Sequence, residues 1–170
     1  EISTGRMICA NAGHEFPAIK RANGKFELFR DKHGFVLAGM ENMRYSEYEI
    51  ELKAGDKLVV YTDGVTEAVN VKEELFGTER MIDSLNSAEE RDCKDLLFTL
   101  KWSIDRFAGK APQFDDITML AIEMKGRRTK EFDVSEESAE KATEFVESIL
   151  SENNIDKKTI YRMNIVVDEI

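Results

Sequence analysis

The sequence has few of the residues that cross-link small secreted proteins, and it has no long apolar run. Its 170 residues include two cysteines, two prolines and one tryptophan. Cys9 and Cys93 lie far apart without metal-ligand spacing, so we expect buried, reduced thiols rather than a disulfide. No apolar run approaches the ~20 residues that cross a bilayer, and no secretory signal is recognisable. We therefore expect a cytoplasmic protein with no membrane-spanning segment in this sequence.

Positive charge is also scarce. The chain carries 24 Lys and Arg residues against 34 Asp and Glu residues, which gives a net charge of −10. A negative surface repels nucleic acids and anionic membranes, so neither is expected as a main partner. A phosphorylated substrate is not excluded, because a bound divalent cation reverses the local field. The 42% hydrophobic content and ten phenylalanines predict a packed globular core.

Residues 58–61 (LVVY) predict a buried strand that ends in an acid. Asp63 and Gly64 follow at the carboxyl end of this run. A carboxylate beside a buried strand loses hydration unless a positive charge meets it. Asp-Gly between apolar runs is also a strong hairpin signal, so this stretch alone leaves a turn and a functional acid both open.

A second acidic pair stands at the start of a predicted strand over residues 117–124. Asp115 and Asp116 precede apolar residues that alternate between two faces. If this strand runs antiparallel to residues 58–61, Asp63 and Asp115 reach the same rim of the sheet. Clustered carboxylates repel each other, and a hard cation with oxygen ligands relieves that repulsion. An Asx-type turn is the alternative for Asp115-Asp116 alone, whereas the two acidic positions together indicate a divalent metal site.

The segments around these two strands predict a β-rich domain with helices. Asn23-Gly24 indicates a two-residue hairpin turn. His14 is expected to fix a turn rather than to act in catalysis, because no second His, Cys or spaced acid stands near it. Trp102 is expected to pack beside the apolar stripe of its helix. The strands are expected over residues 7–10, 17–21, 25–29 and 45–52, and the helices over 79–85, capped by Thr78, and 92–108, ended by Gly109.

The composition changes at residues 126–130 (GRRTK), where glycine and positive charge cluster in an acidic chain. This segment indicates a linker, with a solvated turn as the alternative. Beyond it, apolar residues at helical spacing predict one helix from about Ser135 to Leu150 and a second after Asp156. The predicted units are residues 1–126 and 127–170.

Several short motifs now point to a family. They are residues 11–14 (NAGH) followed by Pro17, 55–58 (GDKL), 61–68 (YTDGVTEA), 76–77 (FG) and 115–118 (DDIT). In this order they resemble the bacterial SpoIIE/RsbU-like serine phosphatases, a branch of the metal-dependent PPM (type-2C-like) phosphatases. The resemblance covers roughly residues 2–125, the carboxyl-terminal half of that catalytic domain.

The resemblance implies an α+β fold, an antiparallel β-sandwich flanked by helices, of which this chain carries part. It implies two Mn²⁺ or Mg²⁺ ions that activate a water for attack on a phosphoserine or phosphothreonine. Asp63 and Asp115 match metal-binding acids of the family, and Asp116 falls where relatives vary between Asp and Asn, so it is a candidate to support those ligands. The family's first-half Asp-Gly-His-Gly motif is absent, and so is the acid that bridges the two ions. This stretch alone is therefore expected to be inactive.

The tail, residues 132–170, is similar to the opening of an RsbW-like anti-sigma-factor kinase domain of the GHKL class. This implies a helical segment from an α/β ATPase-type domain, with Glu169 as its general base. ATP is implied only where that domain is complete. The implied partners are a phosphorylated anti-sigma-factor antagonist as substrate, a sigma factor, and a second copy in a homodimer. The alternatives are a non-catalytic scaffold with a phosphatase-like fold, used for sensing or dimerisation, and an interface between domains.

Overall fold

The computed structural model describes residues 1–30, 34–113, 115–126 and 138–152. The chain divides into two compact units, Glu1–Gly126 and Arg127–Ile170, and each is described by itself. In the second unit the described element is α3 (Ser138–Glu152), which overlaps the helix predicted from about Ser135 to Leu150 and continues two residues beyond it. The helix expected after Asp156 lies outside the described residues.

A four-stranded antiparallel sheet forms the centre of the first unit. Its order is β3-β2-β5-β6, and its strands are β3 (Phe26–Leu28), β2 (Ala18–Lys20), β5 (Lys57–Tyr61) and β6 (Met119–Glu123). The central strand β5 is almost completely buried, which explains its continuous apolar run. Strands β5 and β6 pair antiparallel, with Tyr61 opposite Met119, which meets the condition for Asp63 and Asp115 to reach one rim of the sheet.

Strands β1 (Arg6–Ala10) and β4 (Glu47–Glu51) form a separate antiparallel pair, with Ala10 opposite Glu47. The glutamates of β4 are exposed, while Tyr48 and Ile50 face the four-stranded sheet. The two sheets share a small apolar cluster of buried residues. Its members are Ile19, Ile50, Leu52 and Leu58.

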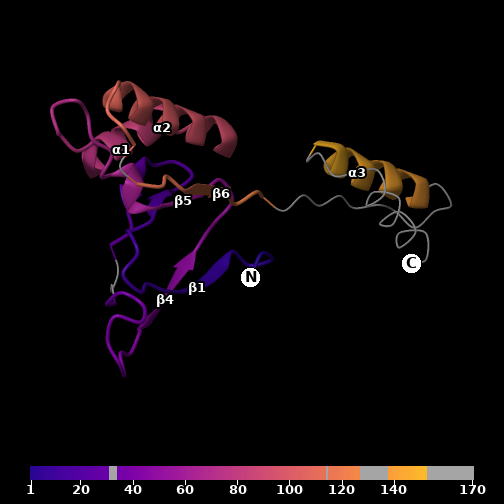
Figure 1. The fold of residues 1–170 in the computed structure, drawn as a ribbon. Helices are drawn as coiled ribbons and strands as arrows, with labels where there is room; N and C mark the ends of the chain where they lie inside the picture. Colours follow the sequence, from indigo (N-terminus) through magenta and orange to yellow (C-terminus); the bar gives the residue numbers. More distant parts are fainter. Residues whose placement is uncertain (31–33, 114, 127–137, 153–170) are drawn as a thin grey trace. The chain divides into compact units, whose positions relative to one another are not determined.

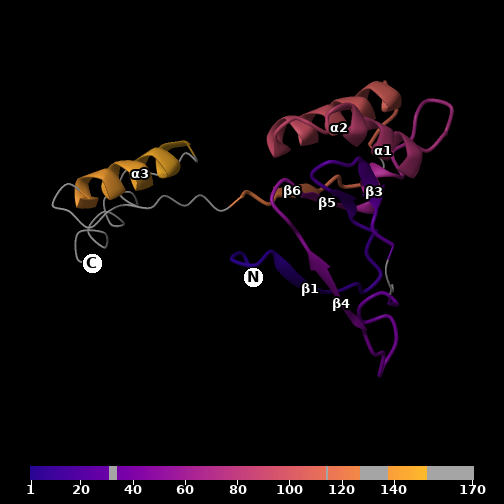
Figure 2. The same ribbon diagram turned by 180° about the vertical axis from the view of Figure 1, so that it is seen from behind.

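Helices α1 (Gly77–Ser87) and α2 (Cys93–Ala108) cover the opposite face of the four-stranded sheet. Figures 1 and 2 show both helices on one side of β5 and β6, with the β1–β4 pair on the other side. Asp92 caps α2 by accepting a hydrogen bond from the Asp95 amide at 2.8 Å, and Gly109 ends the helix, as predicted. The layers match the expected antiparallel sandwich flanked by helices.

The connection between β2 and β3 differs from the expected two-residue turn at Asn23-Gly24. The register places Lys20 opposite Phe26, so residues 21–25 form the connection. Asp56 holds this longer loop, because its carboxylate accepts the Ala22 amide at 2.9 Å and the Arg21 guanidinium at 2.6 Å. A partner far along the sequence therefore overrides the local Asn-Gly signal.

Two expectations for the helices were wrong. Thr78 does not cap α1, which begins at Gly77; the Gly77 amide instead donates to the Thr66 carbonyl at 2.9 Å. Trp102 does not pack beside the apolar stripe but is 59% exposed, with the Arg106 guanidinium 5.1 Å from its ring centre.

Both cysteines are free and half-buried, and burial raises the pKa of each thiol above its ordinary value. Among the helices that the structure describes, none has both the length and the apolar character needed to cross a bilayer.

Candidate metal centre at the ends of β5 and β6

Asp63 lies directly beyond the carboxyl end of β5, where the chain enters the short 3-10 helix η1 (Asp63–Val65). The hairpin interpretation of Asp63-Gly64 is therefore wrong. Strand β5 pairs with β2 and β6, and its partner β6 begins just after Asp115 and Asp116. The antiparallel register brings the segments that carry these acids to the same edge of the sheet.

Thr62 joins the two acid-bearing segments beyond the last paired residues of the strands. Its amide donates to the Thr118 carbonyl at 3.0 Å, and its hydroxyl donates to the Asp116 carbonyl at 2.8 Å. The same hydroxyl oxygen accepts the Thr118 amide at 3.0 Å. The sequence motifs did not predict this role of Thr62, although a hydroxyl residue directly after a buried strand is the signal that could have indicated it.

Gly64 allows the closest approach between the two segments. A Cβ atom at this position would lie 2.5 Å from the Asp116 carbonyl oxygen and 3.3 Å from the Asp115 carbonyl oxygen. Real Cβ atoms do not approach a backbone oxygen at 2.5 Å, so this position requires glycine. The Asp-Gly pair is thus explained by tertiary contact with the second acidic segment rather than by a hairpin turn.

The three carboxylates are exposed and lightly bound. One oxygen of Asp63 accepts the Gly64 amide at 3.0 Å, and one oxygen of Asp115 accepts the Asp116 amide at 2.7 Å. Within the described ranges, no Lys, Arg or His forms an ion pair with any of the three. Free carboxylate oxygens without a nearby cation are the donor type that Mg²⁺ and Mn²⁺ prefer.

The donor set fits a divalent cation in kind but is small in number. Across the part of the chain that the structure describes, no group of three His, Cys, Asp or Glu side chains is placed to hold one ion. Asp63, Asp115 and Asp116 are therefore neighbours along one edge without forming one coordination cluster. Their assignment as metal ligands stays a prediction. Glu169 lies outside the described residues, and its role stays a prediction as well.

The segment 11–14 (NAGH) precedes β2 at the same end of the sheet, because Ala18 lies opposite Val59 in the antiparallel pair of β2 with β5. Asn11 fixes this turn, and the Nδ1 atom of the His14 ring lies 3.3 Å from the carbonyl oxygen of the next residue, Glu15. The Asn11 side chain accepts the His14 amide at 2.8 Å and donates to the His14 carbonyl at 2.9 Å. The His14 side chain is exposed.

Tyr61 lies under this edge of the sheet with its hydroxyl buried. The residue is 2% exposed, and its hydroxyl oxygen has no hydrogen-bond partner among the described residues. Burial, together with the negative charge of Glu15, raises the pKa of Tyr61 to about 12. The phenol therefore stays neutral near the acidic edge at physiological pH.

Solved structures with a similar fold include bacterial phosphatase domains. A structure of the RsbU and RsbW domains of Rv1364c from Mycobacterium tuberculosis matches with a TM-score of 0.69 and 20% identity, covering 97% of this chain and 47% of that chain. The phosphatase domain of SpoIIE from Bacillus subtilis, presoaked with Mn, matches with a TM-score of 0.59 and 17% identity, covering 76% and 56%. At these identities the likeness is one of fold.

Sequence comparison points the same way. Protein IcfG from Synechocystis sp. (strain ATCC 27184 / PCC 6803 / Kazusa) is 31% identical over 122 residues, which are 72% of this chain and 19% of IcfG. The chain thus spans about a fifth of that relative. The protein-family model described as Stage II sporulation protein E (SpoIIE) matches residues 1–125. Over these residues, with the paired acidic strand ends that the fold brings to one edge, the chain belongs to the SpoIIE family.

Proposed function

We propose that residues 1–126 form the carboxyl-terminal half of the catalytic domain of a metal-dependent protein serine/threonine phosphatase. The observation that carries the proposal is the joining of the β5 end to the segment before β6 by Thr62, which brings Asp63 to the edge that carries Asp115 and Asp116. Membership of the SpoIIE family and the fold shared with solved phosphatase domains support it.

Asp63 and Asp115 would hold Mn²⁺ or Mg²⁺, and Asp116 would support these ligands. Bound ions would supply an activated water and stabilise the charge that develops on the phosphoryl group. The chain's own contribution is positional. Thr62 holds the two acid-bearing segments at a fixed spacing, and Gly64 allows them to touch. A complete site needs further ligands, because the described residues offer no group of three.

Electrostatics also favours a cation at this edge. The chain carries a net charge of −10, and three exposed aspartates lie along the edge without an ion-pair partner in the described ranges. A phosphorylated substrate would be repelled by these carboxylates alone. A divalent cation reverses the local sign and gives the phosphate a site to bind.

The proposed substrate is the phosphorylated form of an anti-sigma-factor antagonist in bacterial partner-switching signalling, in the cytoplasm. A sigma factor and a second copy of the chain are the further proposed partners. Residues 127–170 are proposed as a linker and the opening helices of an RsbW-like kinase domain, with Glu169 as its base and ATP as ligand of the complete domain. The named domains of the Rv1364c structure and the boundary after Gly126 support this order.

A second candidate function is a non-catalytic scaffold with a phosphatase-like fold, used for sensing or dimerisation. The observation that favours it is the lack of a third metal-ligating side chain among the described residues. The exposed, unpaired state of Asp63 and Asp115 favours the enzyme, because a scaffold gains nothing from unneutralised acids at this edge.

The experiment compares full-length proteins in the hydrolysis of a small phosphate ester with Mn²⁺. Asp63→Asn and Asp115→Asn are each expected to lower turnover by about 100-fold or more, since each removes a charged metal ligand. Asp83→Asn is the matched control, because Asp83 is an exposed acid on α1. Turnover that stays unchanged in Asp63→Asn would remove the metal assignment, and wild-type protein without Mn²⁺-dependent turnover would favour the scaffold.

A further inference from the structure

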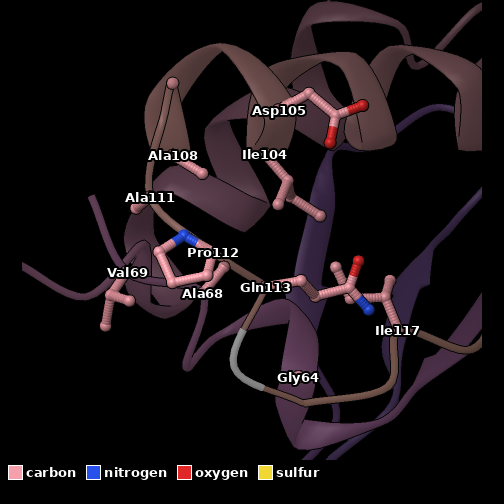
Figure 3. Close-up of a pocket in the computed structure, with 11 residues that line it drawn as sticks. Gly64, Ala68, Val69, Ile104, Asp105, Ala108, Ala111, Pro112, Gln113 and Ile117 are labelled. Atoms are coloured by element: carbon pink, nitrogen blue, oxygen red, sulfur yellow. The ribbon is translucent and has the colours of Figure 1, made fainter. Parts of the chain in front are cut away.

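A hollow of about 220 Å³ lies beside the candidate metal centre, between the carboxyl end of α2 and residues 111–113. Figure 3 shows Ile104 and Ala108 on α2 facing this segment, which carries Pro112 and Gln113. Gly64 and Ile117 line the hollow as well, so it adjoins both acid-bearing segments. Neither the sequence motifs nor the family assignment gives it a role.

The hollow is connected to the acidic edge by a hydrogen bond. The Gln113 side-chain amide donates to the Asp115 carbonyl at 2.9 Å, so one wall of the hollow also positions the second acidic segment. Gly64, which also lines the hollow, lies against the Asp116 backbone. A group seated in the hollow therefore lies next to the place where a phosphate would bind.

The size of the hollow limits what can enter it. Pockets for whole drug-sized ligands span about 300–1,000 Å³, whereas an apolar cavity of about 150 Å³ holds one benzene molecule. A volume of about 220 Å³ therefore suits one amino-acid side chain. The space exists because small residues form much of the wall; the small residues that line it are Gly64, Ala68, Ala108, Gly109 and Ala111.

The chemistry of the walls selects an apolar group. Asp105 and Gln113 are the polar side chains of the lining, and both already have partners: the Lys101 ammonium lies 2.5 Å from the Asp105 carboxylate, and Gln113 is bound to Asp115. An acidic side chain would meet Asp105 and the acidic edge, and a lysine ammonium would lose hydration among alanines. An aliphatic side chain gains from burial without such a cost.

We propose that this hollow is a specificity subsite, which receives an aliphatic side chain of the phosphoprotein substrate close to the phosphorylated residue. The proposal rests on the proposed phosphatase function and extends it by naming the substrate feature that is recognised. Ala108 is the residue whose size controls entry, because it lies on the α2 side of the hollow at the end of the helix.

The test uses phosphoserine peptides and the full-length protein with Mn²⁺. The peptides differ at one neighbouring position at a time, which carries Ala, Leu, Lys or Glu. At one such position, Leu is expected to raise kcat/KM over Ala on the order of tenfold. Ala108→Leu fills the hollow and is expected to bring this Leu/Ala ratio close to one. The ratio is measured within one protein sample, so a partly unfolded fraction cancels.

Ala54→Leu is the matched control, because Ala54 is exposed at the opposite end of β5, and it should keep the wild-type ratio. Ala108→Val places a smaller group at the same point and should give an intermediate ratio. The proposal is overturned by a wild-type enzyme without Leu preference at any position, by a Lys preference, by an unchanged ratio in Ala108→Leu, or by equal loss in Ala54→Leu.

A binding measurement separates this proposal from the phosphatase assignment. In methyl-labelled protein, the Leu peptide should shift the Ile104 and Ile117 methyl signals and leave exposed Ile8 unchanged. If the small phosphate ester is not hydrolysed but these signals still shift, the phosphatase function fails while the side-chain site stands. Equal shifts at Ile8, or no shift at Ile104 and Ile117, would overturn the subsite even in an active phosphatase.

Discussion

The two ends of β5 carry the same residue type in opposite states. Asp56, directly before the strand, is 2% exposed, and its carboxylate accepts the Lys53 amide at 3.0 Å, the Ala22 amide at 2.9 Å and the Arg21 guanidinium at 2.6 Å. Asp63, two residues beyond the strand, is exposed, and its carboxylate accepts one hydrogen bond, from the next residue in the chain.

The difference in burial and hydrogen bonding between Asp56 and Asp63 indicates the role of each acid. Burial alone would raise the pKa of Asp56, but the hydrogen bonds from Lys53, Arg21 and Ala22 outweigh it, and the pKa lies below its ordinary value. Both of its oxygens accept hydrogen bonds within the fold, where Asp56 closes the connection between β2 and β3. Asp63 keeps free lone pairs at the edge of the sheet, which is the state expected of an acid that binds something else.

The largest expected stability change comes from Asp56→Ala. This substitution removes the acceptor of two amides and one of the two acceptors of the Arg21 guanidinium, so the free energy of unfolding should fall by about 3 kcal/mol. Asp63→Ala should change it by no more than about 0.5 kcal/mol, because the residue is exposed. Urea denaturation of both variants measures the contrast, and equal losses would show that Asp63 also serves the fold.

The same contrast has a defined pH dependence. The folded pKa of Asp56 is lowered from the ordinary Asp value of about 4, so its stabilisation is complete above that pH. It is lost as the pH falls through the lowered folded pKa, where the carboxylate becomes protonated. Asp56→Asn should flatten the acid slope of stability in this window, whereas Asp63→Asn should retain it.

Metal addition is expected to give the next largest change in the free energy of unfolding. This change should depend on Asp63, beyond the carboxyl end of β5. In the full-length protein, Mn²⁺ at 100 times its Kd should raise the free energy of unfolding by about 2.7 kcal/mol. This increase should vanish in Asp63→Asn and persist in the control Asp83→Asn. Thermal melts with and without Mn²⁺ measure it. An increase that survives in Asp63→Asn would place the ion elsewhere.

Tyr61, at the carboxyl end of β5, predicts a loss of stability in alkali. Its folded pKa of about 12 lies above the unfolded value of about 10, so the neutral phenol stabilises the fold below pH 10. As the pH rises from 10 to 12, about 2 kcal/mol should be lost. Tyr61→Phe should remove this slope, whereas Tyr45→Phe should keep it. A slope that persists in Tyr61→Phe would contradict the assignment.

The smallest effect concerns a third aspartate, which serves the fold from an exposed position. Asp92 caps α2 through the Asp95 amide, and Asp92→Ala should cost about 1 kcal/mol. Asp83→Ala, in the interior of α1, should change stability by less than about 0.5 kcal/mol. Denaturant midpoints rank the two variants. A loss in Asp92→Ala as large as that in Asp56→Ala would contradict the expectation that one exposed cap contributes less than the buried Asp56 carboxylate.

Much of the fold could be predicted from local pattern. The apolar run 58–61 becomes β5, the alternating run around Ile50 becomes β4, and Asp92 and Gly109 bound α2 as expected. These features depend on periodicity and on residues close in sequence. The sequence left the antiparallel pairing of β5 with β6 as a condition, and the structure supplies it.

What the pattern did not predict depends on distant partners. Asn23-Gly24 has the composition of a tight turn, but Asp56 holds a longer loop there. Thr78 is a residue type that often caps helices, but α1 begins at Gly77, whose amide donates to the Thr66 carbonyl. In each case a contact with a residue distant in sequence, rather than the local signal, accompanies the observed turn or helix start.

By itself, the sequence determined the types and order of the elements and the position of an acid at each strand end, because hydrophobic period and end residues act within a few positions. Only the tertiary structure decided which acid is hydrogen-bonded within the fold and which keeps free oxygen lone pairs for a ligand. Arg21 and Ala22 reach Asp56, and Thr62 and Gly64 bring Asp63 to the second acidic segment. Burial and hydrogen bonding depend on what surrounds a side chain in space, and two aspartates that flank one strand can therefore have opposite roles.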